Sequence, residues 1–389
     1  MDEDERNRIE NNKRGKELKM DTKIISMYLP QYHVIPENSK FWGEGFTDWV
    51  SVKQAKPLYN GHYEPRVPYR NNYYDLSQKE NIKWQAEMAK KHGIFGFAMY
   101  HYWFSVDKCV LTKPAEIILE NKDIDMPFCF AWDNGAWKMS WSNVQGNSWA
   151  PMYEKNNDNE NGVLIPFILG GEKEWKKHFE YLLPYFKDER YIKTDNKPVF
   201  IIWSYSDAIN KMAEYWNRLA LDYGFMGMDI IFKHPVKDRI PSKYSQFYYE
   251  PSHSTWETLK YRVINRFKRV VGYNGHLKKY NYDATWKRII KNAEKNKNAN
   301  IYYGGFVDYD DTPRRGVNGS YVDGADPHKF HRYLKRLKSI SDKQGKEYIF
   351  LTAWNEWGEG AYLEPDTRFG FSYLEAVKDI VVKESRNNK

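Results

Sequence analysis

The sequence predicts an α/β fold, a (β/α)8 barrel in which eight parallel strands alternate with helices in a single domain. Three observations support this prediction. Eight short apolar runs recur along the chain, and most are followed by a polar stretch of helical character. The runs are continuously apolar rather than alternating, which is typical of strands buried on both faces of a parallel sheet. The length of 389 residues also fits one barrel with insertions.

The predicted elements follow one another through most of the chain. The strands cover residues 23–29, 94–102, 127–132, 197–203, 228–233, 246–250, 300–307 and 347–353. The helices cover residues 77–92, 114–121, 173–187, 208–222, 327–340 and 373–385. Gly93 ends the first helix and Pro114 opens the second, in agreement with the residue preferences at helix ends.

The domain organisation follows from this element order. Residues 1–21 form a polar N-terminal extension, and residues 22–389 form the barrel, which is the catalytic domain. A basic helical insertion is predicted over 256–297, and an Asn- and Asp-rich loop over 142–162. A doubly wound sheet is the alternative fold, but it needs a glycine-rich phosphate loop after the first strand, and LPQYHVIPEN follows there instead.

The composition argues against a membrane-spanning protein and against an exported one. No apolar stretch is long enough to span a membrane, and the first twenty residues lack the apolar region of a signal peptide. With only two cysteines, the sequence fits a reducing compartment, and we expect a cytoplasmic protein. Aromatic residues make up 17% of the chain, and Tyr and Trp greatly outnumber Phe. Their rings stack on sugars or bases, although core packing is the alternative.

The positive charge is local. The net charge is +8, yet residues 260–297 hold twelve Lys or Arg and only two acidic residues, so the remainder is slightly acidic. Nucleic acid is therefore not an expected partner, because its binding needs basic residues over a continuous face. The basic segment either makes peripheral contact with an anionic membrane or is a solvated helical hairpin. The oligomeric state is left open.

Polar and aromatic residues gather where the predicted strands end, which is where barrel enzymes carry their chemistry. The candidate substrate-binding residues at these ends and in the loop after the first strand are Tyr32, His33, Trp42, Glu44, Tyr100, His101, Trp103, Trp132, Asp133, Asn134, Glu250, Asn355 and Trp357. We expect the aromatic members Tyr32, Trp42, Tyr100, Trp103, Trp132 and Trp357 to line a glycan groove, although they could instead be core residues.

The strongest local signal is AWNEWGEGAYLEPD at residues 353–366, directly after the last strand. Glu356 and Glu359 share one face if the chain turns there, as Gly358 and Gly360 favour. Two carboxylates between indole rings suit cleavage of a glycosidic bond, because the apolar rings raise the pKa of the acid that protonates the leaving oxygen. The alternative is that both glutamates only balance a helix dipole.

The sequence gives only weak support for a metal site or a cofactor. His33, His62 and His101 are accompanied by no HExxH motif, so we expect no metal site and no cofactor. Asp308, Asp310 and Asp311 lack the spacing of a calcium loop. Asp308 and Asp310 formally match the DxD metal motif of nucleotide-sugar transferases.

Four blocks of the sequence together resemble the WbsX-type family. These blocks are residues 28–68, 73–76, 93–104 and 352–366, and the resemblance runs from about residue 22 to residue 385. This family is named as glycosyltransferases, is found with polysaccharide-assembly genes, and is similar to glycoside hydrolase family 99, the endo-α-mannosidases and endo-mannanases. The resemblance implies a (β/α)8 barrel with its site at the carboxyl ends of the strands.

The resemblance also implies roles for the two glutamates, since the WNEWxEG motif of the family 99 hydrolases matches Trp354 to Gly360. Glu356 would deprotonate the sugar 2-hydroxyl, which attacks the anomeric carbon to give an anhydro-sugar. Glu359 would be the general acid and then the base, with retention of configuration. One departure is WDNGAW at Asp133 to Gly135, where the family usually carries an Asn-Glu pair.

The sequence thus predicts an enzyme that acts on an oligo- or polysaccharide. The favoured function is a retaining glycoside hydrolase that cleaves an α-linked sugar, mannose-like by analogy. The first alternative is a WbsX-type glycosyltransferase in surface polysaccharide biosynthesis. The second alternative is a barrel that binds glycans without catalysis.

Overall fold

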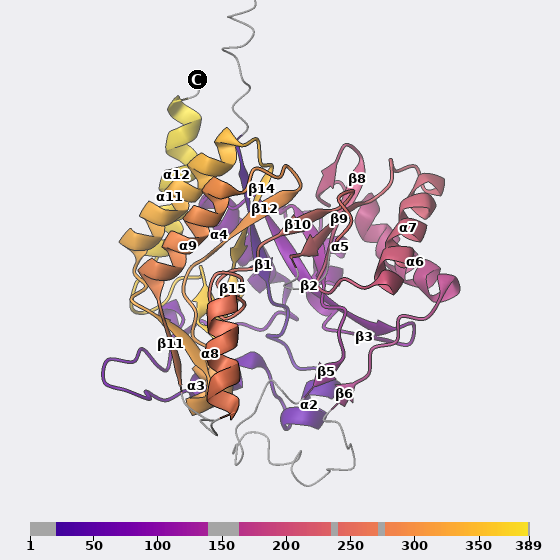
Figure 1. Cartoon of the computed structure of the whole chain (residues 1–389). Coiled ribbons are helices and arrows are strands. Elements are labelled where there is room, and N and C mark those ends of the chain that lie inside the picture. The colour runs from indigo at the N-terminus through magenta and orange to yellow at the C-terminus, as the bar shows by residue number, and fades with distance from the viewer. Residues whose placement is uncertain (1–20, 139–162, 235–239, 271–276, 388–389) are drawn as a thin grey trace, which may run out of the picture.

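The structure, a computed structural model, describes residues 21–138, 163–234, 240–270 and 277–387. At its centre, eight parallel strands form a closed barrel (Figure 1). In chain order they are β1 (Lys23–Tyr28), β2 (Gly96–Ser105), β4 (Phe128–Trp132), β8 (Lys197–Ile202), β9 (Asp229–Lys233), β10 (Ser245–Phe247), β12 (Ile301–Phe306) and β14 (Tyr348–Thr352). Consecutive strands are neighbours, and β1 pairs with both β2 and β14. The predicted (β/α)8 barrel is therefore confirmed.

Helices surround the barrel and bury its outer face. They are α4 (Lys79–Lys91), α5 (Lys113–Glu120), α6 (Glu172–Lys187), α7 (Asp207–Asp222), α9 (Tyr282–Lys295), α11 (Pro327–Lys343) and α12 (Ser372–Asn387). Side chains cap the first turns of three of them: Ser206 for α7, Asn281 for α9 and Asp326 for α11 each accept a hydrogen bond from a backbone N–H. These caps satisfy N–H groups that the helices cannot. The local sequence thus fixes where the helices begin.

Shorter helices and strands lie in the connections between the barrel elements. The helices α2 (Pro36–Trp42) and α3 (Asp48–Gln54) follow β1, and α10 (Thr312–Arg315) follows β12. Small strands are β3 (Lys108–Val110), β5 (Trp137–Lys138), β6 (Val163–Ile165), β7 (Lys193–Thr194), β11 (Lys278–Asn281) and β13 (Ser320–Asp323). None of the helices in the described ranges combines the length and apolarity needed to cross a membrane.

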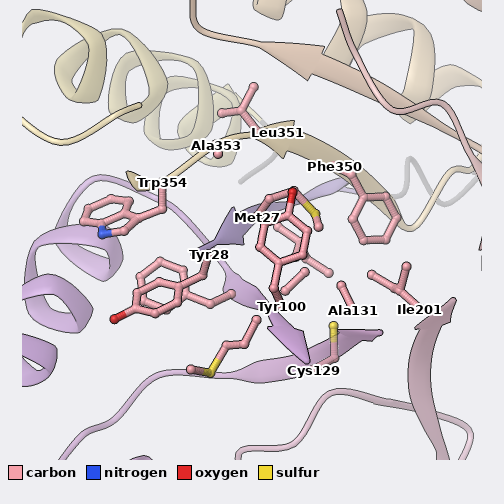
Figure 2. Packing of buried hydrophobic residues seen from close by; sticks show 14 of the residues in the cluster. Met27, Tyr28, Tyr100, Cys129, Ala131, Ile201, Phe350, Leu351, Ala353 and Trp354 are labelled. Atoms are coloured by element: carbon pink, nitrogen blue, oxygen red, sulfur yellow. The ribbon is translucent and has the colours of Figure 1, made fainter. Parts of the chain in front are cut away.

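The strand register determines which side chains fill the barrel. Met27 lies opposite Ala98, which lies opposite Cys129, so these three share the inner face. Two residues on, Tyr100 lies opposite Ala131, which lies opposite Ile201. Figure 2 shows most of these residues as one packed cluster. The interior is therefore filled by side chains and leaves no pore, and the carboxyl ends of the strands are the place where barrel enzymes carry their sites.

The structure divides the predicted insertion 256–297 in two. Its second half, α9, is a barrel helix whose buried residues include Trp286 and Ile289 and which packs against α11 and β12. Its first half contains α8 (Leu259–Val270), which projects from the barrel (Figure 1). Amphipathic spacing alone could not separate a barrel helix from an added one, because both segments are rich in Lys and Arg and carry apolar residues at helical spacing. The predicted loop 142–162 and residues 1–20 lie outside the described residues.

Candidate active site

The segment after β14 forms a tight platform that holds both glutamates. Glu356 ends the two-residue strand β15 (Asn355–Glu356), which pairs with β16 (Ala361–Tyr362), and Glu359 ends the 3-10 turn Trp357–Glu359 between them. The Asn355 side chain ties this platform to β1, because its Oδ1 accepts from the Leu29 N–H at 2.7 Å and its Nδ2 donates to the Leu29 carbonyl at 3.0 Å.

The glycines of the WGEG sequence are needed for two different reasons. A side chain at Gly358 would place its Cβ 2.5 Å from Asp48 Oδ2 and 2.6 Å from Arg314 Nε. Gly360 has a φ of +58°, in the left-handed region that favours glycine, and a Cβ there would lie 2.8 Å from the Arg66 guanidinium carbon. The chain therefore turns sharply here and lets charged groups approach its backbone.

Arg314 is the centre of the site, because its guanidinium binds both glutamates. Its Nη1 donates to Glu359 Oε1 at 2.8 Å, and its Nη2 donates to Glu356 Oε2 at 3.2 Å. The same guanidinium holds Asp48 through Nε at 3.1 Å and Nη2 at 2.9 Å. One buried cation is thus shared by three carboxylates, an arrangement that fixes the geometry of all four side chains.

Burial and charge act on Glu356 in opposite directions. Burial and the neighbouring Glu359 carboxylate raise the pKa of Glu356 to about 8, while Arg314 opposes the rise. The Glu356 side chain is 6% exposed and the Glu359 side chain is 23% exposed. The inner carboxyl is therefore a stronger base than an ordinary glutamate, and the outer one is closer to solvent.

Three tyrosines from two strands surround the glutamate pair. Tyr100 and Tyr102 lie on the inner face of β2, and Tyr249 follows β10, with its hydroxyl 3.1 Å from that of Tyr100. Burial raises the pKa of Tyr249, and the charges of Glu359 and Glu356 add to this effect. Burial likewise raises the pKa of Tyr102, together with Asp133 and Glu356. These tyrosines thus stay neutral and lie within electrostatic range of the carboxylates.

Lys233 and Trp203 lie beside Tyr249 at the carboxyl ends of the strands. Lys233, the last residue of β9, places its Nζ 5.4 Å from the ring centre of Trp203 and 5.3 Å from that of Tyr249. It also forms an ion pair with Glu257 at 3.5 Å. Burial raises the pKa of Asp133 to about 6, although Lys233 opposes the rise. These groups are suited to binding sugar rings and hydroxyls beside the glutamates.

Tyr32 and Trp357, predicted to line the groove, are buried supports of the platform. The Tyr32 hydroxyl donates to the Asn355 carbonyl at 2.5 Å and accepts from the Trp357 N–H at 3.1 Å. The Trp357 ring stacks on Tyr362 at 3.7 Å between centres, and its Nε1 donates to Glu364 at 2.7 Å. Both side chains are about 1% exposed. These contacts hold the backbone on either side of Glu356 and so help to position both glutamates.

Three other predicted substrate-binding residues face the helix layer instead. Trp103 stacks on His178 of α6, with ring centres 4.3 Å apart and planes inclined by 5°. Trp132 packs edge-on against the same His178 at 4.9 Å, and its Nε1 donates to the Trp103 carbonyl. His101 Nε2 lies 2.8 Å from His178 Nε2, and burial lowers the pKa of His101 to about 3. They are core residues here because alternate residues of a strand face opposite sides.

We expect Trp103→Ala to act on stability rather than on glycan affinity. Loss of a buried indole against α6 should lower the free energy of unfolding by about 3–5 kcal/mol. Trp203→Ala, beside Tyr249, is the matched substitution and should weaken glycan binding more than it destabilises the fold. Urea unfolding and calorimetric glycan titration of both variants check this. A stable Trp103→Ala protein with weakened binding would contradict the placement.

The remaining predicted residues lie apart from the glutamates. His33 Nδ1 donates to the Pro30 carbonyl at 3.0 Å, and burial lowers its pKa. Trp42 forms a small separate cluster with Phe46, and Glu44 is exposed in the loop after α2. Asn134 binds the backbone of Ser204 through both side-chain atoms, and Glu250 accepts two hydrogen bonds from Ser254. These hydrogen bonds hold the segments that follow the strands in place.

The DxD acids belong to a network of protein ion pairs. Asp308 accepts from Arg66 Nη1 at 2.9 Å, and Asp310 accepts from His62 Nε2 at 2.7 Å. His62, Glu64 and Asp310 bring their ligand atoms within 4.8 Å of one another, close enough for a metal ion. However, His62 Nδ1 accepts the Leu58 N–H at 3.0 Å, which leaves the proton on the Nε2 that faces Asp310. In this tautomer His62 donates a hydrogen bond to Asp310, so both ring nitrogens of His62 are engaged by protein groups.

Sequence reasoning missed four residues that complete the site: Asp48, Arg314, Tyr249 and Lys233. Arg314 had a signal, because DYDDTPRR follows the seventh strand directly and places a cation at the carboxyl end of the barrel. Lys233 also ends a predicted strand. Asp48 had none, since its partner Arg314 is 266 residues away in the chain.

Two glutamates thus share one arginine among tyrosines at the carboxyl end of a (β/α)8 barrel. The sequence profile of the family described as glycosyltransferase WbsX matches residues 24–377, and the chain belongs to this family.

Two curated proteins match most of the chain. The chain is 25% and 26% identical over 373 residues to the uncharacterized WxcX proteins of two strains of Xanthomonas campestris pv. campestris. The alignment covers 92% of the chain but 50% of these proteins, so the chain spans about half the length of these curated relatives.

The solved structures support the fold. A family 99 endo-α-mannosidase from Bacteroides thetaiotaomicron has a TM-score of 0.53 and 14% identity, with 95% of this chain and 98% of that chain covered. A glycoside hydrolase-like protein has a TM-score of 0.52 and 14% identity, with 93% and 94% covered.

Proposed function

We propose that the protein is a retaining glycoside hydrolase that cleaves an α-linked sugar within an oligo- or polysaccharide. The observation that carries this proposal is the pairing of Glu356 and Glu359 on the single guanidinium of Arg314 at the catalytic end of the barrel. Two carboxyl groups that differ in burial are what acid and base steps at one glycosidic bond require.

In the proposed first step, Glu356 takes the proton of the sugar 2-hydroxyl, and that oxygen attacks the anomeric carbon. The bond to the leaving oxygen breaks, and Glu359 gives its proton to that oxygen. The proton of the 2-hydroxyl then lies on Glu356, whose pKa is raised to about 8 by burial and by the Glu359 carboxylate, so Glu356 holds this proton until the second step. The product of the step is an anhydro-sugar.

In the second step, Glu359 takes a proton from water, and the water oxygen attacks the anomeric carbon. The anhydro ring opens, and oxygen 2 recovers its proton from Glu356. Two inversions give net retention, and both carboxyl groups return to their starting state. The greater exposure of Glu359 supports its role, since leaving group and water both enter from solvent.

The family description favours a second candidate, a glycosyltransferase that builds a polysaccharide. Such an enzyme needs a nucleotide-sugar donor, and the DxD acids would be its metal ligands. The engagement of Asp308 by Arg66 and of Asp310 by His62 supports the hydrolase instead. The third possibility, glycan binding without catalysis, conflicts with the presence of both glutamates on their shared arginine.

The purified protein should separate these candidates in the presence of EDTA and without nucleotide. We expect it to cleave members of a set of α-linked manno-oligosaccharides, with the α-anomer released first in proton NMR. The matched 2-deoxy substrate should not react, because its nucleophile is absent. Failure to cleave the set, together with metal-dependent extension from a nucleotide sugar, would contradict the hydrolase proposal and establish the transferase.

A further inference from the structure

The helix α8 carries an apolar stripe that faces solvent. Leu259, Val263 and Phe267 recur every fourth residue, so they lie on one face of the helix. They are 75%, 60% and 67% exposed, respectively. Ile264 beside them is 37% exposed. A solvated helical hairpin would turn polar residues outward, so this face calls for a different explanation.

The opposite side of α8 attaches the helix to the barrel. Tyr261, two positions from both Leu259 and Val263, packs against Tyr280 of β11 at 5.0 Å between ring centres. The Arg288 guanidinium of α9 lies 5.7 Å from the centre of the Tyr261 ring. Because residues two apart point to different sides of a helix, these contacts hold the apolar stripe outward.

The positive charge of α8 is complementary to an anionic surface. Its sequence, LKYRVINRFKRV, contains the five cations Lys260, Arg262, Arg266, Lys268 and Arg269 and no acidic residue. The Arg266 side chain is exposed, as is Lys278 in the neighbouring strand β11. Exposed apolar side chains on a helix rich in Lys and Arg are the features of helices that lie in the interface of an anionic bilayer.

The position of α8 relates this surface to the active site. Trp256, three residues before the helix, packs on Tyr309 with ring centres 5.0 Å apart. Burial, Asp311 and then Glu359 raise the pKa of Tyr309, so the Glu359 carboxylate lies close enough to act on this tyrosine. Figure 1 shows α8 reaching toward the end of the molecule that also carries α2 and α3, the elements that follow β1.

We propose that α8 is an interfacial anchor that docks the catalytic end of the barrel onto an anionic membrane. The apolar stripe enters the boundary between headgroups and acyl chains, while the cations bind lipid phosphates. The contact is peripheral and reversible, since a helix of 12 residues with five cations lies along the surface. This proposal is independent of the reaction that the glutamates perform.

Flotation of the full chain with lipid vesicles tests the docking. Vesicles of phosphatidylcholine mixed with phosphatidylglycerol should bind the protein at low salt, whereas vesicles of phosphatidylcholine alone should not. Rising salt should weaken the binding, because it screens the cations. Phe267→Ser should weaken it on the order of tenfold or more, and Arg266→Gln, at an exposed cation of α8, about fivefold.

A matched control separates docking from general surface effects. Leu221→Ser removes an apolar side chain that is 56% exposed on α7, and it should leave vesicle binding unchanged. Circular dichroism should show the same helix content for Leu221→Ser, Phe267→Ser and the unmodified protein. No binding to the mixed vesicles at low salt, or equal binding by Phe267→Ser, would overturn the proposal. So would a dimer in the absence of lipid that Phe267→Ser dissociates, because α8 would then join two copies of the chain.

Discussion

Replacing Glu359 with glutamine is expected to slow cleavage of an oligosaccharide by about 10²–10⁴-fold, since no group then protonates the leaving oxygen. The loss should be much smaller on an aryl glycoside with an activated leaving group, which departs without a proton. Glu356→Gln should impair both substrates, because the attacking 2-hydroxyl keeps its proton. Steady-state kinetics on the two substrates measure the difference.

The matched control for these variants is Glu44→Gln, which changes an exposed carboxyl in the loop after α2. It should leave both rates within about twofold, as an exposed substitution far from any ion pair does. If Glu359→Gln lost the same activity on both substrates, Glu359 would not be the acid. If Glu356→Gln retained activity on both, the 2-hydroxyl would not be the nucleophile.

Arg314→Met should have the largest effect on stability. The substitution leaves Asp48, Glu356 and Glu359 together without their shared cation, and breaking such a buried ion pair costs about 3–5 kcal/mol. Arg315→Met is the matched control. Its side chain is 41% exposed and pairs with Asp311, so it should cost about 1 kcal/mol or less.

The destabilisation by Arg314→Met should depend on pH. Without the guanidinium, which lowers it, the pKa of Glu356 in the folded variant rises further above the ordinary value of about 4.3. The folded state then holds protons that the unfolded state has released, so stability falls as pH rises through the range between these values. Urea unfolding at mildly acidic and mildly alkaline pH measures this. A cost independent of pH would show that the carboxylates do not repel one another.

The sequence was sufficient for the barrel and for the glutamate pair. The strands were predictable because burial on both faces leaves continuous apolar runs such as residues 197–203. Glu356 and Glu359 were predictable because both lie in one short motif, where two glycines impose the turn. Features that a few neighbouring residues determine are therefore readable from sequence.

Two kinds of feature could not be predicted from the sequence. One is the face of a strand on which a residue lies, and the other is a contact between segments far apart in the chain. In the run YHYWF at residues 100–104, aromatic residues occupy both faces of β2, so composition did not distinguish Tyr100, which faces the barrel, from Trp103, which faces α6. The partnership of Arg314 with Asp48 joins segments after the first and seventh strands of the barrel. Only the closed barrel brings them together.

The account rests on Glu356 and Glu359 acting as one electrostatic unit, and a carbon-13 NMR titration of labelled glutamate carboxyls tests this directly. Comparison with Glu356→Gln assigns the signal of Glu356, which should titrate near the pKa of about 8 that burial and Glu359 impose. In Glu359→Gln this pKa should fall, because a neighbouring negative charge is removed, and in Arg314→Met it should rise. A Glu356 signal that titrates near the ordinary value of about 4.3 and does not respond to Glu359→Gln would contradict the account.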